Sequence, residues 1–365
     1  MTEQKLYEIA LTLIPYIGDV NGKKLVAYCG GAEAVFCENK KALRRISGMN
    51  DIIIQSIESK EVMMRAEEEM QFVEKNGIKP LFYLDKDYPK RLQHCHDSPM
   101  MLYYKGNADL NVEKTVGIVG TRNITDYGKY VVEKIVEDLS SDNVMIISGL
   151  AYGVDAAAHR AALKYDLATV GVLGHGMQTI YPVANKKLST NMIEKGGILT
   201  EFVRGTVPFS GNFPKRNRIV AGMVDCLVVV ESALKGGAMI TADIANSYDR
   251  EVFAVPGKVG DIYSEGCNQL IKANKANILV NATDIRYVMR WDVDTKVVAK
   301  QMRLFRDFSE DEKKLMDVFE KNSVVHLDDI IVGTDLSPSK IASILLSLEF
   351  DGVLTALPGK RYQKL

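Results

Sequence analysis

The stretch Val116-Gly117-Ile118-Val119-Gly120-Thr121-Arg122 decides the fold. Its first four residues include no polar side chain, and the run ends at a glycine followed by two polar residues. Such a continuous run is typical of a strand buried on both faces of a helix-covered parallel sheet. Similar runs follow at residues 144–147, 168–173, 197–199, 226–230 and 252–255, each spaced to leave room for a helix. This alternation predicts an α/β fold with an extended Rossmann-like doubly wound parallel sheet.

The segments on either side of this sheet have a different pattern. Residues 1–75 place apolar residues at helical spacing around two glycine turns, which predicts a helical N-terminal module. The turns have a helix-hairpin-helix outline that can meet a phosphate, although plain helical packing fits equally well. We place the Rossmann-like domain at residues 76–285, with a connector at 76–112 that packs on it, and a linker at 286–307.

Residues 308–365 are predicted to form a C-terminal winged-helix-like domain. Ser309 and Glu312 have the spacing of a capping box, and Ser337-Pro338 starts a second helix. A short β-ribbon follows at residues 353–362. The second helix contains one cation, Lys340, whereas duplex binding depends on neutralising phosphates. A protein-contact role or a weak accessory DNA role is therefore favoured for this domain.

Composition restricts the function. The 365 residues are 47% hydrophobic and 25% charged, which is ordinary for a globular protein. No apolar run reaches the ~18 residues of a membrane span, and the first residues are polar, so we expect a cytoplasmic protein without a membrane partner. Five cysteines without a Cys-x-x-Cys pair argue against disulfides and a zinc site. His94-Cys95-His96 is a poor metal site because sequence neighbours point in different directions.

Glycine-rich loops follow the predicted strands. They are Gly120-Thr121-Arg122, Ser148-Gly149, Gly174-His175-Gly176 and Lys235-Gly236-Gly237-Ala238. In doubly wound folds these loops meet at one edge of the sheet, where glycine and helix N-termini let backbone N–H groups approach a phosphate. The set predicts a phosphate-bearing ligand, and ordinary tight turns are the alternative. Neither a P-loop nor a dinucleotide-binding Gly-x-Gly-x-x-Gly follows the first strand, so no cofactor is expected.

The segment Phe213-Pro214-Lys215-Arg216-Asn217-Arg218 combines an aromatic ring with three cations. Binding of single-stranded nucleic acid requires a stacking face next to phosphate-neutralising charge. Because the formal net charge is −1, any such charge has to be gathered locally. The alternatives are burial of Phe213 in the core, and salt bridges that engage Arg216 or Arg218.

Together these motifs resemble the DprA/Smf family of DNA processing proteins. The matching runs lie at residues 119–122, 148–155 with His159, 174–176 with Tyr181-Pro182 and Asn185, 213–222, 235–242, 255–257 and 264–271. The resemblance implies binding of single-stranded DNA, loading of the RecA recombinase during natural transformation, and a homodimer. It assigns DNA binding to Arg122, base stacking to Phe213, backbone contacts to Gly237, Ala238 and Met239, and a further contact to Asn268. The dimer and RecA surface would lie around residues 262–279.

The full predicted DNA site adds the loop and cationic residues. It comprises Gly120, Thr121, Arg122, Ser148, Gly149, Gly174, Gly176, Lys186, Lys187, Phe213, Arg216, Asn217, Arg218, Gly237, Ala238, Met239 and Asn268. Two departures from the family are visible. Val183 stands where some members have a lysine, so we assign that charge to Lys186 and Lys187. Residues 236–238 are Gly-Gly-Ala instead of the usual Ser-Gly-Ser, which removes two hydroxyl donors.

Two other functions compete with the DNA-binding mediator. Asp155, His159 and Glu201 lie near the loop edge in sequence and could act as acid and base in a nucleotide or sugar-phosphate hydrolase. The required Pro-Gly-Gly-x-Gly-Thr motif is only partly echoed at residues 236–241, so we expect no enzyme. A scaffold that binds only proteins suits the near-neutral charge but leaves Arg122 and the glycine loops unexplained.

Overall fold

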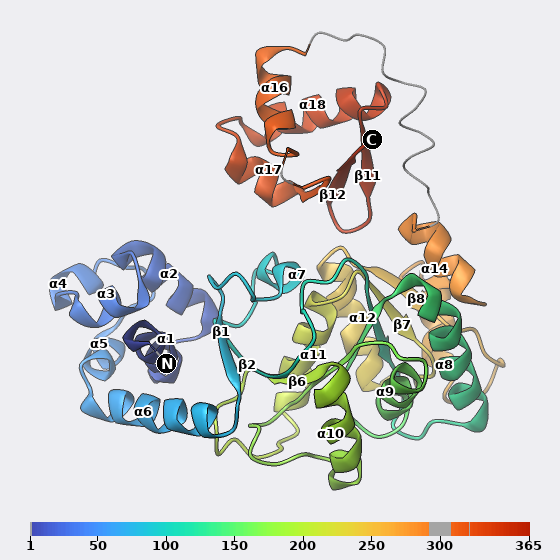
Figure 1. Ribbon diagram of the computed structural model, residues 1–365, viewed down its shortest axis with the longest axis horizontal. Helices are drawn as coiled ribbons and strands as arrows, with labels where there is room; N and C mark the ends of the chain where they lie inside the picture. Colours follow the sequence, from blue (N-terminus) through green and yellow to red (C-terminus); the bar gives the residue numbers. More distant parts are fainter. Residues whose placement is uncertain (1, 292–307, 321) are drawn as a thin grey trace.

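The computed structural model describes residues 2–291, 308–320 and 322–365. Its central feature is a nine-stranded sheet in the order β1-β2-β6-β5-β4-β3-β7-β8-β9 (Figure 1). The strands predicted from apolar runs are all present. They are β3 (Thr115–Val119), β4 (Met145–Ser148), β5 (Thr169–Val172), β6 (Gly197–Thr200), β7 (Cys226–Val229) and β8 (Glu251–Ala254), and they pair in parallel. The Rossmann-like sheet expected from the sequence is confirmed.

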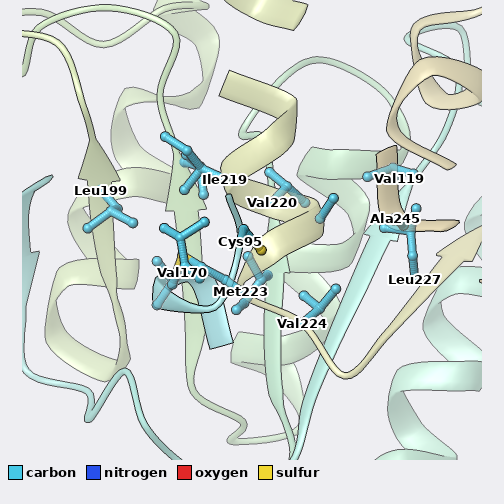
Figure 2. Close-up of a cluster of buried hydrophobic side chains, with 14 of the residues drawn as sticks. Cys95, Val119, Val170, Leu199, Ile219, Val220, Met223, Val224, Leu227 and Ala245 are labelled. Carbon is cyan, nitrogen blue, oxygen red and sulfur yellow. The ribbon is translucent and has the colours of Figure 1, made fainter. Parts of the chain in front are cut away.

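Alternate residues of each strand enter separate cores on the two faces. In β7, Cys226 and Val228 pack with α8 (Asp126–Leu139), α9 (Val154–Lys164) and α14 (Ala282–Met289). Leu227 and Val229 pack on the opposite face with α11 (Asn212–Gly222), α12 (Gly237–Ser247) and α13 (Glu265–Lys272). Figure 2 shows part of this second core. Burial on both faces explains why the strands are apolar throughout.

The connector at residues 76–112 does more than pack on the domain. Its strands β1 (Lys79–Phe82) and β2 (Met101–Gly106) pair with each other and extend the sheet, because β2 pairs antiparallel with β6. A two-residue strand, β9 (Asn277–Ile278), completes the opposite edge and was not predicted. Of the expected linker at 286–307, residues 286–289 close α14, and residues 292–307 lie outside the described part of the chain.

The N-terminal residues are helical, as expected. They form α1 (Glu3–Leu13), α2 (Asp19–Cys29), α3 (Ala32–Cys37), α4 (Lys40–Leu43), α5 (Asp51–Ile57) and α6 (Lys60–Lys75). One apolar core joins these helices to Phe82, Met101 and Tyr103 of the antiparallel edge. The module therefore packs on the sheet extension, to one side of the parallel strands (Figure 1).

The C-terminal residues form a separate small core of helices and a three-stranded sheet. The predicted capping box is present, because the Ser309 hydroxyl accepts from the Glu312 N–H and the Glu312 carboxylate accepts from the Ser309 N–H. The elements are α16 (Glu310–Asp317), β10 (Val324–His326), α17 (Leu327–Gly333), α18 (Pro338–Phe350), β11 (Leu354–Leu357) and β12 (Arg361–Lys364), and they confirm the winged-helix-like fold. No single described helix has the length and apolar composition of a membrane span, and the pair α17–α18 that meets both limits together is bent by 118°.

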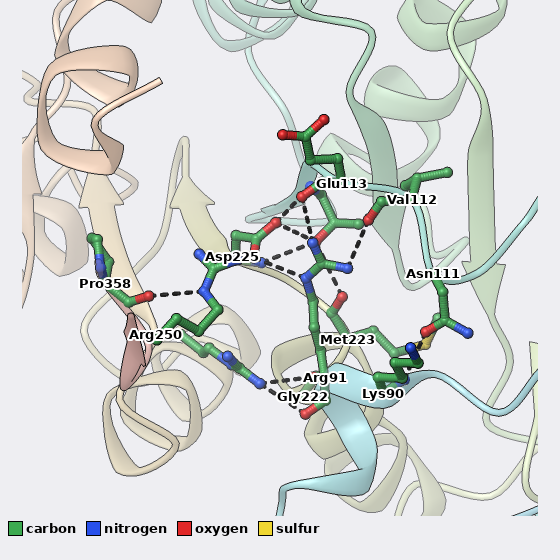
Figure 3. A network of polar contacts seen from close by, with 12 residues as sticks. Lys90, Arg91, Asn111, Val112, Glu113, Gly222, Met223, Asp225, Arg250 and Pro358 are labelled. Carbon is green, nitrogen blue, oxygen red and sulfur yellow. Dashed lines mark hydrogen bonds and ion pairs between the residues drawn. The ribbon is translucent and has the colours of Figure 1, made fainter. Parts of the chain in front are cut away.

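A buried carboxylate, Asp225, ties three parts of the chain together just before β7 (Figure 3). It accepts hydrogen bonds from the Thr115 N–H at 2.8 Å and from the Arg91 Nε at 2.8 Å. Arg361 of β12 forms a further ion pair with it at 2.9 Å. Burial alone would raise the pKa of Asp225, but the two arginines and the hydrogen bonds lower it to about 2.

This depressed pKa predicts an acid-dependent loss of stability. An unfolded aspartate titrates near pKa ~3.9, so the ionised Asp225 contributes about 2–3 kcal/mol above that pH. The contribution disappears as the pH falls from about 4 to about 2. Urea unfolding should therefore show that Asp225→Asn is less stable than the wild type at pH 7, with the difference shrinking between pH 4 and pH 2. The exposed Asp243→Asn is the control, and a difference for Asp225→Asn that is independent of pH would contradict the account.

Candidate nucleic-acid interface

A cleft of about 460 Å³ opens at the carboxyl ends of β3, β4 and β7. Successive strands run outward from β3 on the β4 side, and the chain then crosses to β7 on the other side of β3. The cleft therefore lies at the topological switch point, where doubly wound sheets bind ligands. Its lining includes Gly120, Thr121, Arg122, Gly149, Asp155, Phe213, Arg216, Asn217, Gly236, Gly237 and Ala238. Three of the four predicted glycine loops thus meet in one place.

The loop after β3 is fixed by Glu231, which sequence reasoning missed. The Glu231 carbonyl accepts from the Thr121 N–H at 2.6 Å, and its carboxylate accepts from the Thr125 N–H at 3.0 Å and from the Thr125 hydroxyl. Gly120 is required here, because a Cβ would lie 2.8 Å from the same carbonyl oxygen. A lone carboxylate directly after the apolar strand was the available signal. With its backbone held in this way, Arg122 is exposed at the mouth of the cleft.

An aromatic surface lies beside Arg122. The guanidinium carbon is 5.3 Å from the centroid of the Phe213 ring, within cation–π range. The Tyr181 ring also stacks with Phe213, with ring centroids 6.3 Å apart and an angle of 30° between the rings. Gly174 leaves space for Phe213, because a Cβ would be 2.9 Å from the ring. Tyr152 also lines this part of the cleft and is 49% exposed.

Neither tyrosine was among the predicted site residues. Both lie inside motifs that were recognised, and Tyr181 directly precedes Pro182 in a loop after β5. Their proximity to Phe213 depends on folding, because the two tyrosines lie on separate loops and Phe213 lies at the start of α11. The sequence therefore contained the residues without indicating that they would meet.

Arg216 lies beneath the cleft and is only 5% exposed. Its guanidinium donates to the carbonyl oxygens of Gly149 and Val172, which follow β4 and end β5. Its Nε donates to the Asn217 side chain at 3.1 Å. Arg216 therefore positions the loops of the cleft through its Nε and one terminal nitrogen, and its assignment to DNA binding stays a prediction.

Several predicted residues lie away from the cleft or are engaged elsewhere. Arg218 forms ion pairs with Glu201 and with Asp19 of the N-terminal module. Asn268 accepts from the Gly257 N–H at 3.2 Å and donates to the Gly257 carbonyl at 3.0 Å, so it holds that loop. Gly176 is buried against Val203. The Ser148 hydroxyl donates to the Ile118 carbonyl at 2.6 Å.

The remaining predicted contacts come from two helix N-termini. The N-cap of α12 is Gly236, so the first N–H groups of the helix, at Gly237 and Ala238, have no intrahelical acceptor. A Cβ at Gly237 would touch nothing within 4 Å, and the backbone is therefore open to a ligand. Met239 is partly buried under the same turn. Lys186 and Lys187 begin α10 (Lys186–Lys195) and are exposed, but they do not line the cleft.

The three candidate acid–base residues do not share one cavity, since Asp155 and His159 lie one turn apart on α9 and Glu201 lines a different cavity. Asp155 lines the cleft, and burial raises its pKa. His159 is fully buried, hydrogen-bonded to Thr169 at 2.7 Å, and burial lowers its pKa to about 3, with the Arg216 charge adding to the effect. Burial raises the pKa of Glu201 to about 7 despite its pairing with Arg218 in a different cavity. This arrangement disfavours the hydrolase.

Among the described residues, one group has the composition of a metal site. The ligand atoms of His94, His326 and Asp328 lie within 4.8 Å of one another. The two imidazoles stack at 3.9 Å with only 15° between their planes. Their in-plane lone pairs therefore run nearly parallel instead of converging on one ion. The group lies at the contact with the winged helix and does not belong to the cleft.

The fit around Arg216 leads to a prediction for Gly149. A Cβ at this position would lie 2.3–2.6 Å from the Arg216 guanidinium, and overpacking of this kind costs about 1–3 kcal/mol. Gly149→Ala should lower the free energy of unfolding measured with urea by about that amount. Gly237→Ala is the matched control, since its Cβ meets open space, and it should leave stability unchanged. Equal stability of the two variants would contradict the proposed role of Arg216.

Comparison with known proteins agrees with this architecture. Residues 79–290 match the family model of DNA recombination-mediator protein A, and residues 306–360 match the DprA winged helix domain. Protein Smf of Synechocystis is 31% identical over 99% of both chains, and the DNA processing protein DprA of Streptococcus pneumoniae is 39% identical over 55% of this chain and 71% of its own.

Two solved structures are similar. The structure of S. pneumoniae DprA covers 79% of this chain and 98% of its own, with 31% identity and a TM-score of 0.68. The structure of Helicobacter pylori DNA processing protein A, described for its single-stranded DNA binding mode, covers 59% of this chain and 96% of its own, with 29% identity and a TM-score of 0.54. The chain therefore belongs to the DNA recombination-mediator protein A family.

Proposed function

We propose that the cleft binds single-stranded DNA and that the chain acts as a recombination mediator, not as an enzyme. The observation that supports this most directly is the pairing of exposed Arg122 with the half-buried Phe213 ring, 5.3 Å apart, beside the open N-terminus of α12. The arginine and the helix N–H groups suit consecutive phosphates. The ring suits an unpaired base, because a base in a duplex presents no free face for stacking.

Two tyrosines enlarge the aromatic surface beside Phe213. Tyr181 and Tyr152 are 46% and 49% exposed and lie next to Phe213 around the mouth of the cleft. Stacking on such rings tolerates any base, which is what a mediator on incoming DNA requires. The exposed Lys186 and Lys187 at the start of α10 offer two further cations for phosphates outside the cleft. The relative from H. pylori, studied for its single-stranded DNA binding mode, supports this assignment.

Membership of the family leads us to propose a role for the protein after it has bound DNA. The chain would protect incoming single strands and load RecA onto them during natural transformation, in the cytoplasm. A homodimer would place two clefts on one strand. Exposed apolar residues support such a surface: Ile278 is 51% exposed on the edge strand β9, and Ile262 is 61% exposed in the loop before α13. Leu279, in contrast, is buried and belongs to the core.

Variants of the cleft test the DNA-binding proposal. Stacking on one aromatic residue is worth ~1–3 kcal/mol, so Phe213→Ala should weaken binding of labelled oligo-dT by roughly fivefold to a hundredfold. Arg122→Glu should weaken it by more, and the salt dependence should become shallower because a phosphate contact is lost. Fluorescence anisotropy over a salt series measures both effects.

Lys134→Glu provides the matched charge reversal, because Lys134 lies on α8 outside the cleft and pairs with Glu137. Its affinity and salt slope should equal those of the wild type. Equal losses in the Lys134 and Arg122 variants would indicate nonspecific attraction and reject the cleft as the binding site. Equal affinity for oligo-dT and a matching duplex would reject the single-strand proposal.

The dimer surface is tested separately. Ile262→Asp places a charge on the proposed apolar contact and should shift the protein from dimer to monomer in sedimentation velocity. Val332→Asp is the control, since Val332 is 87% exposed on the winged helix. A wild-type protein that sediments as a monomer at micromolar concentration would contradict the homodimer without affecting the cleft.

A further inference from the structure

The tip of the winged helix faces its own chain. The turn between β11 and β12 carries Lys360, and β12 begins with Arg361; a wing could offer both cations to DNA phosphates. The Lys360 Nζ instead lies 2.7 Å from the Asp249 carboxylate, and an Arg361 guanidinium nitrogen lies 2.9 Å from Asp225. Both partners belong to the Rossmann-like domain, with Asp225 directly before β7 and Asp249 shortly before β8.

The Arg361 contact is buried. The Asp225 side chain is 1% exposed and the Arg361 side chain 19%. A desolvated carboxylate of this kind requires counter-charges, and Arg91 supplies only one of the two. Arg361 therefore completes a charge cluster that the Rossmann-like domain leaves unfinished, and Figure 3 shows Asp225 between the two parts of the chain.

Two further contacts surround this pair. The Arg290 guanidinium donates to the Thr355 hydroxyl at 2.7 Å, joining the end of α14 to β11. His94, at the end of α7 (Lys90–Gln93), stacks on His326 at 3.9 Å. The contact thus uses residues from both ends of the wing strands and from the turn that joins β10 to α17.

The docking surface lies at the amino-terminal edge of the sheet. Asp225 precedes β7, whereas the cleft residues Ser232 and Ala233 follow that strand. The winged helix and the cleft therefore occupy opposite ends of the same strands. Docking leaves the cleft open but withholds Lys360 and Arg361 from any nucleic acid.

Helix α18 is the element of the winged helix that would enter the groove of a duplex, and it is also poorly suited to binding DNA. Its cation, Lys340, is paired with the Asp311 carboxylate at 2.5 Å. Leu346 and Phe350 are exposed on α18 at 55% and 82%. With Lys360 and Arg361 engaged as well, α18 and the turn of the wing offer little charge for the phosphate neutralisation on which duplex binding depends.

We propose that the wing is an intramolecular docking element that seats the winged helix on the Asp225–Asp249 edge of its own Rossmann-like domain, and that it is not a DNA-binding element. The proposal is independent of the cleft. It assigns Arg361 as the anchor, because it is the wing cation whose partner is buried, and Lys360 as an exposed neighbour that pairs with Asp249.

A zero-length carbodiimide cross-link tests this in the full chain. The reagent condenses the Lys360 amine with the Asp249 carboxylate only while the two groups are in contact. Peptide mass spectrometry on a mixture of ¹⁴N and ¹⁵N protein should find the link within single chains. Excess duplex oligonucleotide should leave its yield unchanged. Arg361→Gln should lower the yield roughly tenfold, the change expected for loss of one charge-assisted hydrogen bond.

Lys364→Gln is the matched control, because this cation at the end of β12 is exposed and, among the described residues, makes no contact with the Rossmann-like domain. Its yield should equal that of the wild type. Hydrogen exchange of the α18 amides checks that the Arg361 variant still folds. If that variant unfolds, His94→Ser removes a contact from the Rossmann side, outside the winged-helix core, and should lower the yield by a smaller factor. Absence of the link, a link that joins ¹⁴N to ¹⁵N chains, or its suppression by duplex DNA would overturn the proposal.

Discussion

The cleft depends on one buried cation. The Arg216 guanidinium holds the carbonyl oxygens that follow β4 and end β5, from a position beneath the loops. A buried arginine is stable only when its donors are satisfied, so the positions of these carbonyls are set together. Gly149 supplies the necessary space. The Arg122 and Phe213 side chains consequently rest on a buried layer formed by Arg216 and the carbonyl groups that it holds.

Helix α11 connects the cleft to other parts of the molecule. Phe213 at its start reaches the cleft, Arg216 joins the strand ends, and Arg218 pairs with Glu201 and with Asp19 of the N-terminal module. This helix thus contacts the cleft, the ends of the central strands and the N-terminal module. The charge-rich segment at residues 213–218 reads in sequence as a single binding motif, but the helical repeat sends its cations in different directions.

This divergence marks the limit of what the sequence reveals. The strands could be predicted because apolar residues such as Val228 and Ile118 require burial in any context. The meeting of the glycine loops could be predicted because the carboxyl ends of parallel strands lie at one edge of the sheet. The partners of Arg218 and Asn268 could not be predicted, because Asp19 and Gly257 are brought to them only by folding. Glu231 and Tyr181 were missed for the same reason. Short apolar runs at residues 81–84 and 100–104 predict two strands in the connector, but the sequence does not show that these strands pair with the sheet.

The most direct test of the central claim is photo-cross-linking of an oligonucleotide containing 5-iododeoxyuridine, followed by mass spectrometry of the adducts. Such a base reacts with an aromatic side chain on which it stacks, so the experiment reports where an unpaired base lies. The account predicts adducts on Phe213 or on the adjacent Tyr181, both at the mouth of the cleft. Adducts confined to the N-terminal module or to the winged helix would contradict it.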